Sequence, residues 1–156
     1  MDSTELMKLA IAKAEEGIAQ GQSPFGCAIA LDGELLSTCH NTVLATIDIT
    51  AHAEINALRA ACRELGRYLL DGALVATTCE PCPMCMAALH WARVGSVYYG
   101  ASIADAEVAG FNELSMPAAE LLHVGGSSVR LVGDTLSGEC RQLFARWQSS
   151  PAATTY

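Results

Sequence analysis

The stretch that decides how this chain folds reads Cys79-Glu80-Pro81-Cys82-Pro83-Met84-Cys85, and it follows His52-Ala53-Glu54 at some distance along the chain. Together the two segments supply two thiols three residues apart, one imidazole and one carboxylate that need not bind a metal. These are the parts of a hydrolytic zinc site, in which three protein ligands leave a position for water. We therefore predict a Zn²⁺ site held by His52, Cys82 and Cys85.

The cysteine half of this motif lies where a helix is expected to start. Pro83 suits the first helical position, so Cys82 becomes the N-cap of a helix that runs to about Arg93. A helix N-terminus stabilises thiolates, and bound zinc does so more strongly. A Cys-x-x-Cys pair alone is also typical of a structural zinc or a redox pair. The other conceivable ligands, which we expect to be packing residues, are Cys39, His40 and Cys79.

The histidine half is predicted to begin another helix, with Thr50 as its N-cap and Leu65 near its end. His52 and Glu54 then fall in the first turn, too close in sequence for both to bind the metal from one helical face. Glu54 is therefore expected to be the general base, taking a proton from water and returning it to a leaving amine. The chemistry that fits is hydrolytic deamination of an amidine-like carbon.

The remaining patterns alternate between helices and short strands. Asp32-Gly33 favours a tight type I′ turn between two antiparallel strands, and Gly26 indicates either a close approach of backbone or ligand, or a bulge. This alternation predicts a three-layer α/β domain over residues 1–148, followed by a flexible tail, residues 149–156. The expected helices are 3–20, 50–65, 83–93, 117–122 and 134–148, and the expected strands are 25–31, 34–38, 73–77, 94–99 and 129–132.

Composition excludes some function classes. The 156 residues carry a formal net charge of −8 with no run of lysine or arginine, which argues against a nucleic acid as a partner. The longest apolar runs are too short to span a bilayer, so no membrane partner is expected. The chain holds seven cysteines. Because thiol ligands persist only where they stay reduced, we expect a cytoplasmic protein.

Several residues are candidates to bind a flat heterocyclic substrate. Asn41 has the donors and acceptors to read a base edge, or it forms an Asx turn. Glu113 is either a second pocket carboxylate or a solvated loop residue. The aromatic candidates, which either stack on a planar ring or belong to the core, are Phe25, Trp91 and Phe111.

At these residues the chain resembles the cytidine deaminase-like zinc deaminase superfamily, whose signature is His-x-Glu with Pro-Cys-x-x-Cys. The resemblance begins at Ser23-Pro-Phe-Gly26 and spans nearly the whole chain. It implies an α/β/α fold with a five-stranded mixed sheet, its last two strands parallel, and an oligomer, here expected to be a homodimer. It also implies that Asn41 reads the base and that the backbone N–H of Ala53 lies beside the reacting water.

Within the superfamily, Trp91-Ala-Arg93 and Ala109-Gly-Phe-Asn-Glu113 resemble the bacterial guanine deaminase group. That likeness implies that Glu113 contacts the base and assists proton transfer, and that Tyr156 closes over the pocket of its own or a partner chain. The group usually has Phe-Asp-Asp where this loop has Phe-Asn-Glu. Residues 134–147 look more like tRNA adenosine deaminases.

These observations predict a zinc-dependent aminohydrolase that converts guanine to xanthine and releases ammonia. The expected partner is a small nucleobase or nucleoside. Three alternatives stay open: a cytosine or other pyrimidine or triazine deaminase, a tRNA adenosine deaminase, and a non-catalytic zinc-stabilised binding module.

Overall fold

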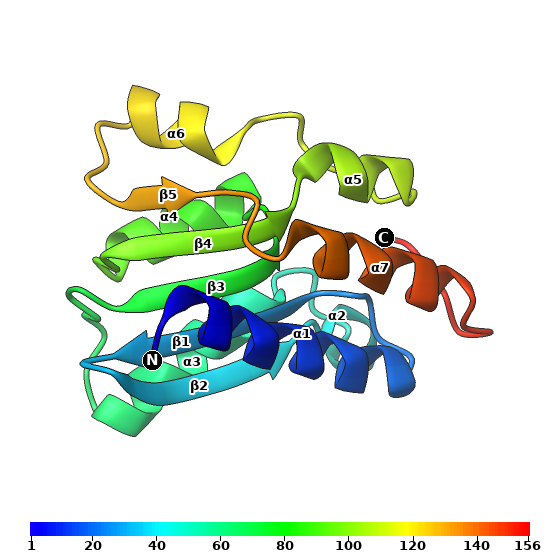
Figure 1. The fold of residues 1–156 in the computed structure, drawn as a ribbon, viewed down its shortest axis with the longest axis horizontal. Helices are drawn as coiled ribbons and strands as arrows, with labels where there is room; N and C mark the ends of the chain where they lie inside the picture. The colour runs from blue at the N-terminus through cyan, green and yellow to red at the C-terminus, as the bar shows by residue number, and fades with distance from the viewer.

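The computed structural model describes residues 1–156, and its helices and strands alternate along most of the chain (Figure 1). No helix has the length and apolar character needed to cross a membrane. The strands are β1 (Gly26–Leu31), β2 (Glu34–His40), β3 (Leu74–Cys79), β4 (Ser96–Ala101) and β5 (Arg130–Val132). The helices are α1 (Ser3–Ala19), α2 (Val43–Thr46), α3 (Ala53–Leu65), α4 (Pro83–Trp91), α5 (Ile103–Val108), α6 (Ala118–Val124) and α7 (Ser137–Gln148).

The strands form one mixed sheet in the order β2-β1-β3-β4-β5. Strand β1 is antiparallel to both of its neighbours, whereas β3, β4 and β5 run parallel. The turn between β1 and β2 has positive φ at both central residues, 52° at Asp32 and 84° at Gly33, as a type I′ turn requires. The predicted five-stranded mixed sheet, its hairpin and its parallel last pair are confirmed.

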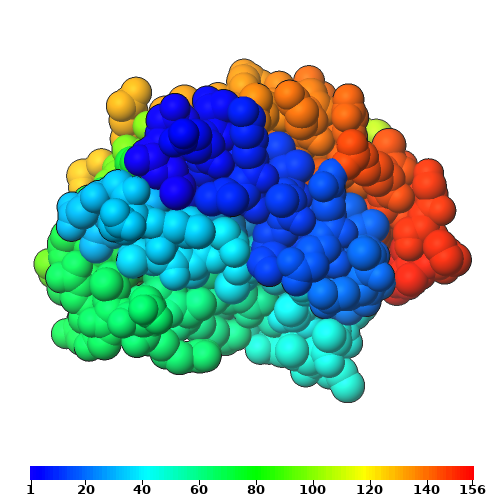
Figure 2. Space-filling model, turned by 60° about the horizontal axis from the view of Figure 1, so that its bottom comes forward, coloured from blue at the N-terminus to red at the C-terminus, as the bar shows by residue number.

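Helices cover both faces of the sheet. Figure 1 shows α1 and α7 in front of the strands and α3 and α4 behind them. Two separate apolar cores, of 18 and 13 buried residues, fill the spaces between the layers. The C-terminal segment (red in Figure 2) packs beside the first helix (blue), where Arg146 pairs with Glu15. The predicted three-layer α/β/α arrangement is therefore present.

Helix α1 lies so close to the sheet that only glycine fits at the start of β1. A Cβ atom added to Gly26 would lie 2.1 Å from the carbonyl oxygen of Ala10 and 2.8 Å from the nitrogen of Ala14. The irregularity in the β1–β2 register lies elsewhere, between Ile29 and Ala30. Gly26 therefore marks a close backbone approach, which lets helix α1 pack directly against the sheet.

Replacing Gly26 by alanine should destabilise the protein by about 1–3 kcal/mol, because the helix must shift away from the sheet to admit the methyl group. The change is measured as a lower urea midpoint with an unaltered slope. Gly138→Ala on α7 is the matched control, since nothing lies within 4 Å of the added Cβ. Equal midpoints for the two variants would contradict this account of the packing.

Two helices begin later than the sequence predicted. The backbone N–H and hydroxyl of Thr50 donate to Oδ1 of Asp48, at 2.9 and 2.7 Å, so Thr50 belongs to a turn and His52 is the N-cap of α3. The last helix starts at Ser137 because Asp134 and Leu136 have left-handed backbones, with φ of 58° and 51°. Helices α2 and α5 were not predicted.

Candidate active site

Two helix starts meet beside the carboxyl end of β3. His52 is the N-cap of α3, Cys82 is the N-cap of α4, and Cys85 lies in the first turn of α4. The first N–H groups of a helix have no partner within it, so both starts offer donors and partial positive charge to thiolates. The parallel strands and their crossover helices thus bring the two halves of the motif together, although 30 residues separate His52 from Cys82.

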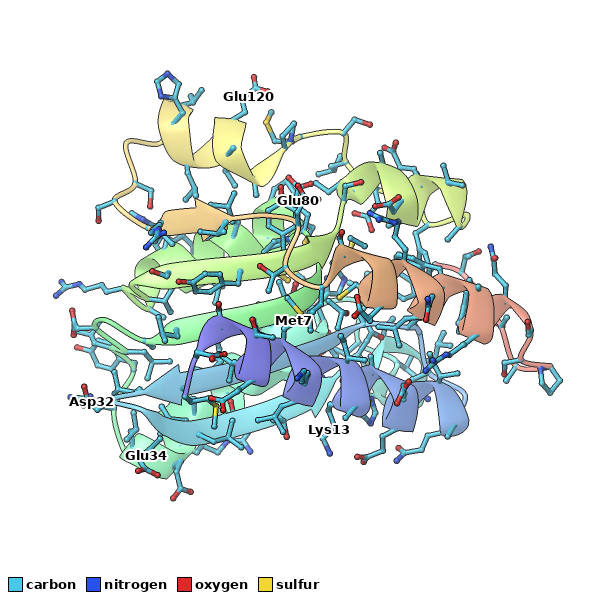
Figure 3. All side chains as sticks on the ribbon, viewed as in Figure 1. Met7, Lys13, Asp32, Glu34, Glu80 and Glu120 are labelled. Atoms are coloured by element: carbon cyan, nitrogen blue, oxygen red, sulfur yellow. The ribbon has the colours of Figure 1, made fainter.

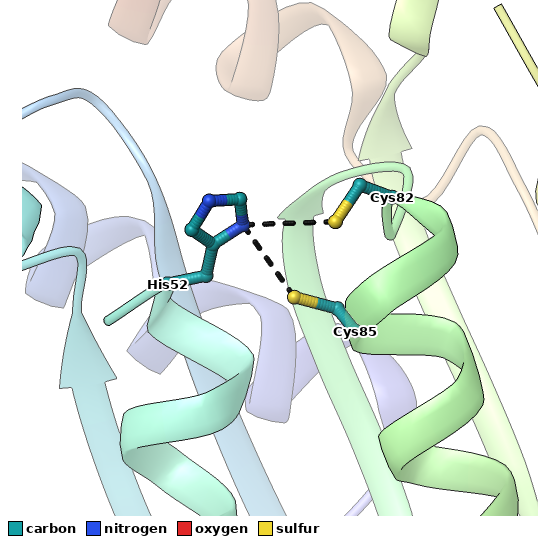
Figure 4. A group of neighbouring side chains, drawn as sticks. All are labelled: His52, Cys82 and Cys85. Carbon is teal, nitrogen blue, oxygen red and sulfur yellow. Dashed lines mark hydrogen bonds between the residues drawn. The ribbon is translucent and has the colours of Figure 1, made fainter. Parts of the chain in front are cut away.

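The three side chains have the spacing of zinc ligands. Nδ1 of His52 lies 3.7 Å from Sγ of Cys82 and 3.5 Å from Sγ of Cys85 (Figure 4). A tetrahedral zinc, with bonds of about 2.0 Å to nitrogen and 2.3 Å to sulfur, separates such atoms by about 3.5 Å. No fourth histidine, cysteine or carboxylate joins this group. The donor set therefore fits zinc with one position left for solvent.

The two thiols, whose sulfur atoms lie within 4.8 Å of each other, differ in acidity. The hydrogen bond from Cys85, with the one to His52, lowers the pKa of Cys82 to about 4. The same bond to Cys82, together with burial, raises the pKa of Cys85 well above its usual range. The lowered pKa of Cys82 favours the thiolate that zinc requires, and metal binding would release the proton of Cys85.

Glu54 lies beside the ligands without belonging to their group. It is 6% exposed, and its Oε1 accepts a hydrogen bond of 3.0 Å from the hydroxyl of Thr77. Burial raises the pKa of Glu54, while the nearby His52 opposes the shift. A carboxyl group whose pKa is moved toward neutrality is suited to take up a proton and give it back. Thr77 had no signal in the sequence analysis.

Asn41 and the C-terminal residue meet across the pocket. Asn41 is 1% exposed, and its Oδ1 accepts a hydrogen bond from the N–H of Val43, which makes the Asx turn. Its Nδ2 donates to the hydroxyl of Tyr156 at 2.6 Å. Burial raises the pKa of Tyr156, so the hydroxyl stays neutral. The space left inside the pocket is about 20 Å³, roughly room for one water.

Glu113 lines the same pocket as Glu54. It is half-buried, and burial, followed by the negative charge on Cys82, raises its pKa. The ring of Phe25 also lines the pocket and meets the edge of Phe111, with centroids 4.9 Å apart. Phe111 is buried behind the tail, with its centroid 5.6 Å from that of Tyr156. The fold thus brings the loop residues Phe111 and Glu113 together with Tyr156 of the tail.

Trp91 is not brought to the site. It is 77% exposed and is the last residue of α4, whereas Cys82 precedes the first. The nine-residue helix separates its two ends by about 12 Å. Trp91 therefore does not form a wall of this pocket. Ala53 is the first residue of α3, so its N–H has no partner within the helix.

The other conceivable ligands have other contacts. Nδ1 of His40 lies 2.7 Å from the carbonyl oxygen of Asn41, and Cys39 packs against the larger core. Cys79 ends β3 as a buried thiol that donates to the carbonyl of Ser102. Sequence reasoning missed one further pocket residue, Glu80, even though it stands inside the cysteine motif.

An open three-ligand metal site at two helix starts, with a buried carboxylate beside it, defines a zinc-dependent hydrolase. The family described as the cytidine and deoxycytidylate deaminase zinc-binding region matches residues 1–101. The chain belongs to this family of deaminases, which are hydrolases acting on C–N bonds. The matched segment contains the three proposed zinc ligands and Glu54.

Curated relatives narrow the comparison without fixing a substrate. The guanine deaminase of Bacillus subtilis (strain 168) is 42% identical over 127 residues, which cover 77% of this chain and 81% of the relative. The tRNA-specific adenosine deaminase of Agrobacterium fabrum is 40% identical over 100 residues, which cover 64% of this chain and 66% of the relative. The predictions of a deaminase and of zinc are confirmed.

Solved structures agree with the fold. The X-ray structure of guanine deaminase from Bacillus subtilis matches with a TM-score of 0.70 and 44% identity over 72% of this chain and 73% of that one. Guanine deaminase from Nitrosomonas europaea matches with a TM-score of 0.86 over 95% of this chain and 85% of that one. Its identity is 24%, so this second likeness concerns the fold alone.

Proposed function

We propose that the protein hydrolyses guanine to xanthine and ammonia. The observation that carries the proposal is the pair of carboxylates, Glu54 and Glu113, that line one pocket with Asn41. Guanine presents two donors side by side, the ring N1–H and the exocyclic amino group at C2. Carboxylates accept such donors, and the Asn41 amide can donate to a ring nitrogen or oxygen on the opposite edge. The 42% identity to a guanine deaminase supports the same choice.

His52, Cys82 and Cys85 would hold the zinc, which when bound lowers the pKa of a water to about 7. Glu54 takes a proton from the attacking water and delivers it to the amino nitrogen at C2, the second proton of the water passes to the ring nitrogen N3, and the C–N bond breaks with ammonia as the leaving group. The oxygen of the water becomes the new carbonyl oxygen. Glu113 holds the amino group and the ring N1–H, and Phe25 forms a wall of the pocket.

The base reaches this pocket only after Tyr156 moves, since about 20 Å³ is free while its hydroxyl bonds to Asn41. We therefore propose that residues 1–148 form the deaminase domain and that residues 149–156 are a tail that opens and closes it. The base then replaces the tyrosine hydroxyl as the partner of the Asn41 amide.

Ammonia release from a panel of free bases and nucleosides tests the proposal. The purified, zinc-loaded protein is assayed with guanine, cytosine, adenine, ammeline and their available nucleosides, with Glu54→Gln as the blank. We expect turnover of guanine above every other compound and none in the blank. Preference for cytosine or a triazine would overturn the guanine assignment and leave the deaminase chemistry intact.

Deamination of adenosine in tRNA is the second candidate, favoured by the 40% identity to the Agrobacterium fabrum enzyme. A chain of net charge −8 has little general attraction for phosphates. Salt-sensitive tRNA binding, together with inosine formation and no turnover of free bases, would establish this function in place of the first. The matching relatives are enzymes, which leaves the non-catalytic binding module without support.

We also propose a cytoplasmic homodimer. All seven cysteines are free, as a reducing compartment would keep them. The neighbouring helices α4 and α6 expose two large apolar side chains, Trp91 at 77% and Val124 at 79%, which association would cover. Light scattering should give twice the mass of one chain, and the mass of a single chain at micromolar concentration would refute the dimer.

A further inference from the structure

The carboxylate of Glu80 bridges two separate helices. Its Oε2 accepts a hydrogen bond of 3.2 Å from the backbone N–H of Ile103, and its Oε1 accepts one of 2.9 Å from the N–H of Ala118. Figure 3 shows Glu80 on the side of the sheet near α5 and α6. Ile103 is the first residue of α5 and Ala118 is the first residue of α6. One side chain therefore caps two helix starts.

Helix α5 has a capping box of Ser102 and Asp105, but that box binds the N–H groups of Ser102 and Asp105 and leaves the N–H of Ile103 to Glu80. Ile103 is 6% exposed and Ala118 is 1% exposed, so water does not readily replace a lost acceptor. The N-cap of α6 is Pro117, which has no capping side chain. A buried N–H without a partner is costly, and a charged acceptor at a helix N-terminus makes one of the stronger hydrogen bonds. Glu80 thus fixes both ends of residues 103–118.

The bridged segment carries the candidate base-binding loop. Between α5 and α6 the chain has no helix or strand, and this stretch contains Phe111 and Glu113. Glu80 itself is anchored to the sheet, because its own N–H donates to the carbonyl of Ala101 at 2.8 Å. It stands two residues before Cys82. Glu80 therefore connects the segment that precedes Cys82 to both ends of the loop that carries Glu113.

We propose that Glu80 is a positioning residue that sets the distance between Glu113 and the metal ligands. Although Glu80 borders the pocket, both of its carboxylate oxygens are occupied by backbone N–H groups, so it acts through Glu113, and the inference rests on the proposed role of Glu113 at the base. The alternative is a purely structural cap, whose loss would lower stability without a specific effect on the step that Glu113 serves.

Glu80→Gln is the sharpest variant, because glutamine has the same shape but only one oxygen to accept from two N–H groups. Glu120→Gln is the matched control: Glu120 lies in the first turn of α6, is exposed, and makes no hydrogen bond to either helix start (Figure 3). Both changes are made in the full chain, alone and in a Glu113→Gln background. Zinc content and the thermal midpoint are recorded for each protein.

We expect Glu80→Gln to lower kcat/KM for guanine about tenfold with unchanged zinc content, and Glu120→Gln to leave it unchanged. In the Glu113→Gln background the further loss should vanish, since the positioned group is gone. An equal loss in both backgrounds, or no loss in either, would overturn the proposal.

Amide hydrogen exchange over residues 103–118 gives a readout that needs no turnover. Glu80→Gln should speed exchange of this segment about tenfold in the metal-free protein, whereas Glu120→Gln should not. If the protein does not turn over guanine, or if Glu113→Gln alone leaves kcat/KM unchanged, the proposed function is wrong. The exchange measurement still tests whether Glu80 bridges the two helix starts. Unchanged exchange in Glu80→Gln would overturn the bridge itself.

Discussion

Glu54→Gln should lower kcat by about 10²–10⁴-fold while the protein keeps a full complement of zinc. The amide cannot take a proton from water, and Glu54 does not belong to the ligand group. The glutamine oxygen can still accept the 3.0 Å hydrogen bond from Thr77, so the site keeps its shape. Single-turnover rates with metal analysis of the same sample measure both quantities. Full turnover by a zinc-loaded variant would mean that another group moves the proton.

The same variant should change how stability depends on pH. Burial raises the pKa of Glu54 above its unfolded value of about 4.3. For an acid shifted in this direction, the contribution to stability is fully present below the unfolded pKa and is lost as pH rises through the folded pKa. Metal-free Glu54→Gln should therefore gain on metal-free wild type in free energy of unfolding as pH rises from about 4 to 8. Urea titrations at both ends of this range test the sign.

Cys85→Ala should abolish zinc binding and turnover together. Cys85 is fully buried, its sulfur is 3.5 Å from Nδ1 of His52, and no other cysteine, histidine or carboxylate lies in position to replace it. Since zinc binds the folded state, its removal also withdraws the stabilisation that comes from ligand binding. Chelation should lower the thermal midpoint of the wild type by several degrees and leave that of Cys85→Ala unchanged.

Cys62→Ala provides the control, because Cys62 lies on α3 outside the ligand group, and the only hydrogen bond of its sulfur is a long one, 3.9 Å, to the carbonyl of Tyr68. It should keep zinc, turnover and the response to chelation. If Cys85→Ala retained stoichiometric zinc, the ligand set inferred from the three-residue spacing would be wrong. Metal analysis after extensive dialysis decides the matter.

The sequence was sufficient to predict the metal group because local rules place its members. Pro83 fixes the start of α4, so Cys82 and Cys85 fall at a helix N-terminus, and the strand before them ends at the same edge of the sheet. His52 is brought to that edge by α3. Its exact role as N-cap was missed because Thr50 binds Asp48, a competition between a turn and a cap that helical periodicity does not reveal.

The features that the sequence did not predict depend on tertiary contacts or lie in segments too short to show a helical periodicity. Helix α5 has six residues, and the only local signal for it was the Ser102 and Asp105 capping box. Trp91 shares a helix with the ligands but stands at its far end, a matter of helix length that residue type does not indicate. The bridge made by Glu80 joins helix starts that lie 23 and 38 residues downstream, so no window of sequence contains it.

If Asn41 binds the base as proposed, its hydrogen bond to Tyr156 makes the chain its own competitive inhibitor. While the tyrosine hydroxyl occupies the amide, a base cannot bind there, so the apparent dissociation constant equals the intrinsic one divided by the fraction of molecules that are open. Each tenfold loss of open molecules weakens apparent binding tenfold without changing any contact to the base. Selectivity among bases is untouched, because the penalty is the same for all of them. Substitutions of Phe111, which lies behind Tyr156, would thus tune affinity and leave preference alone.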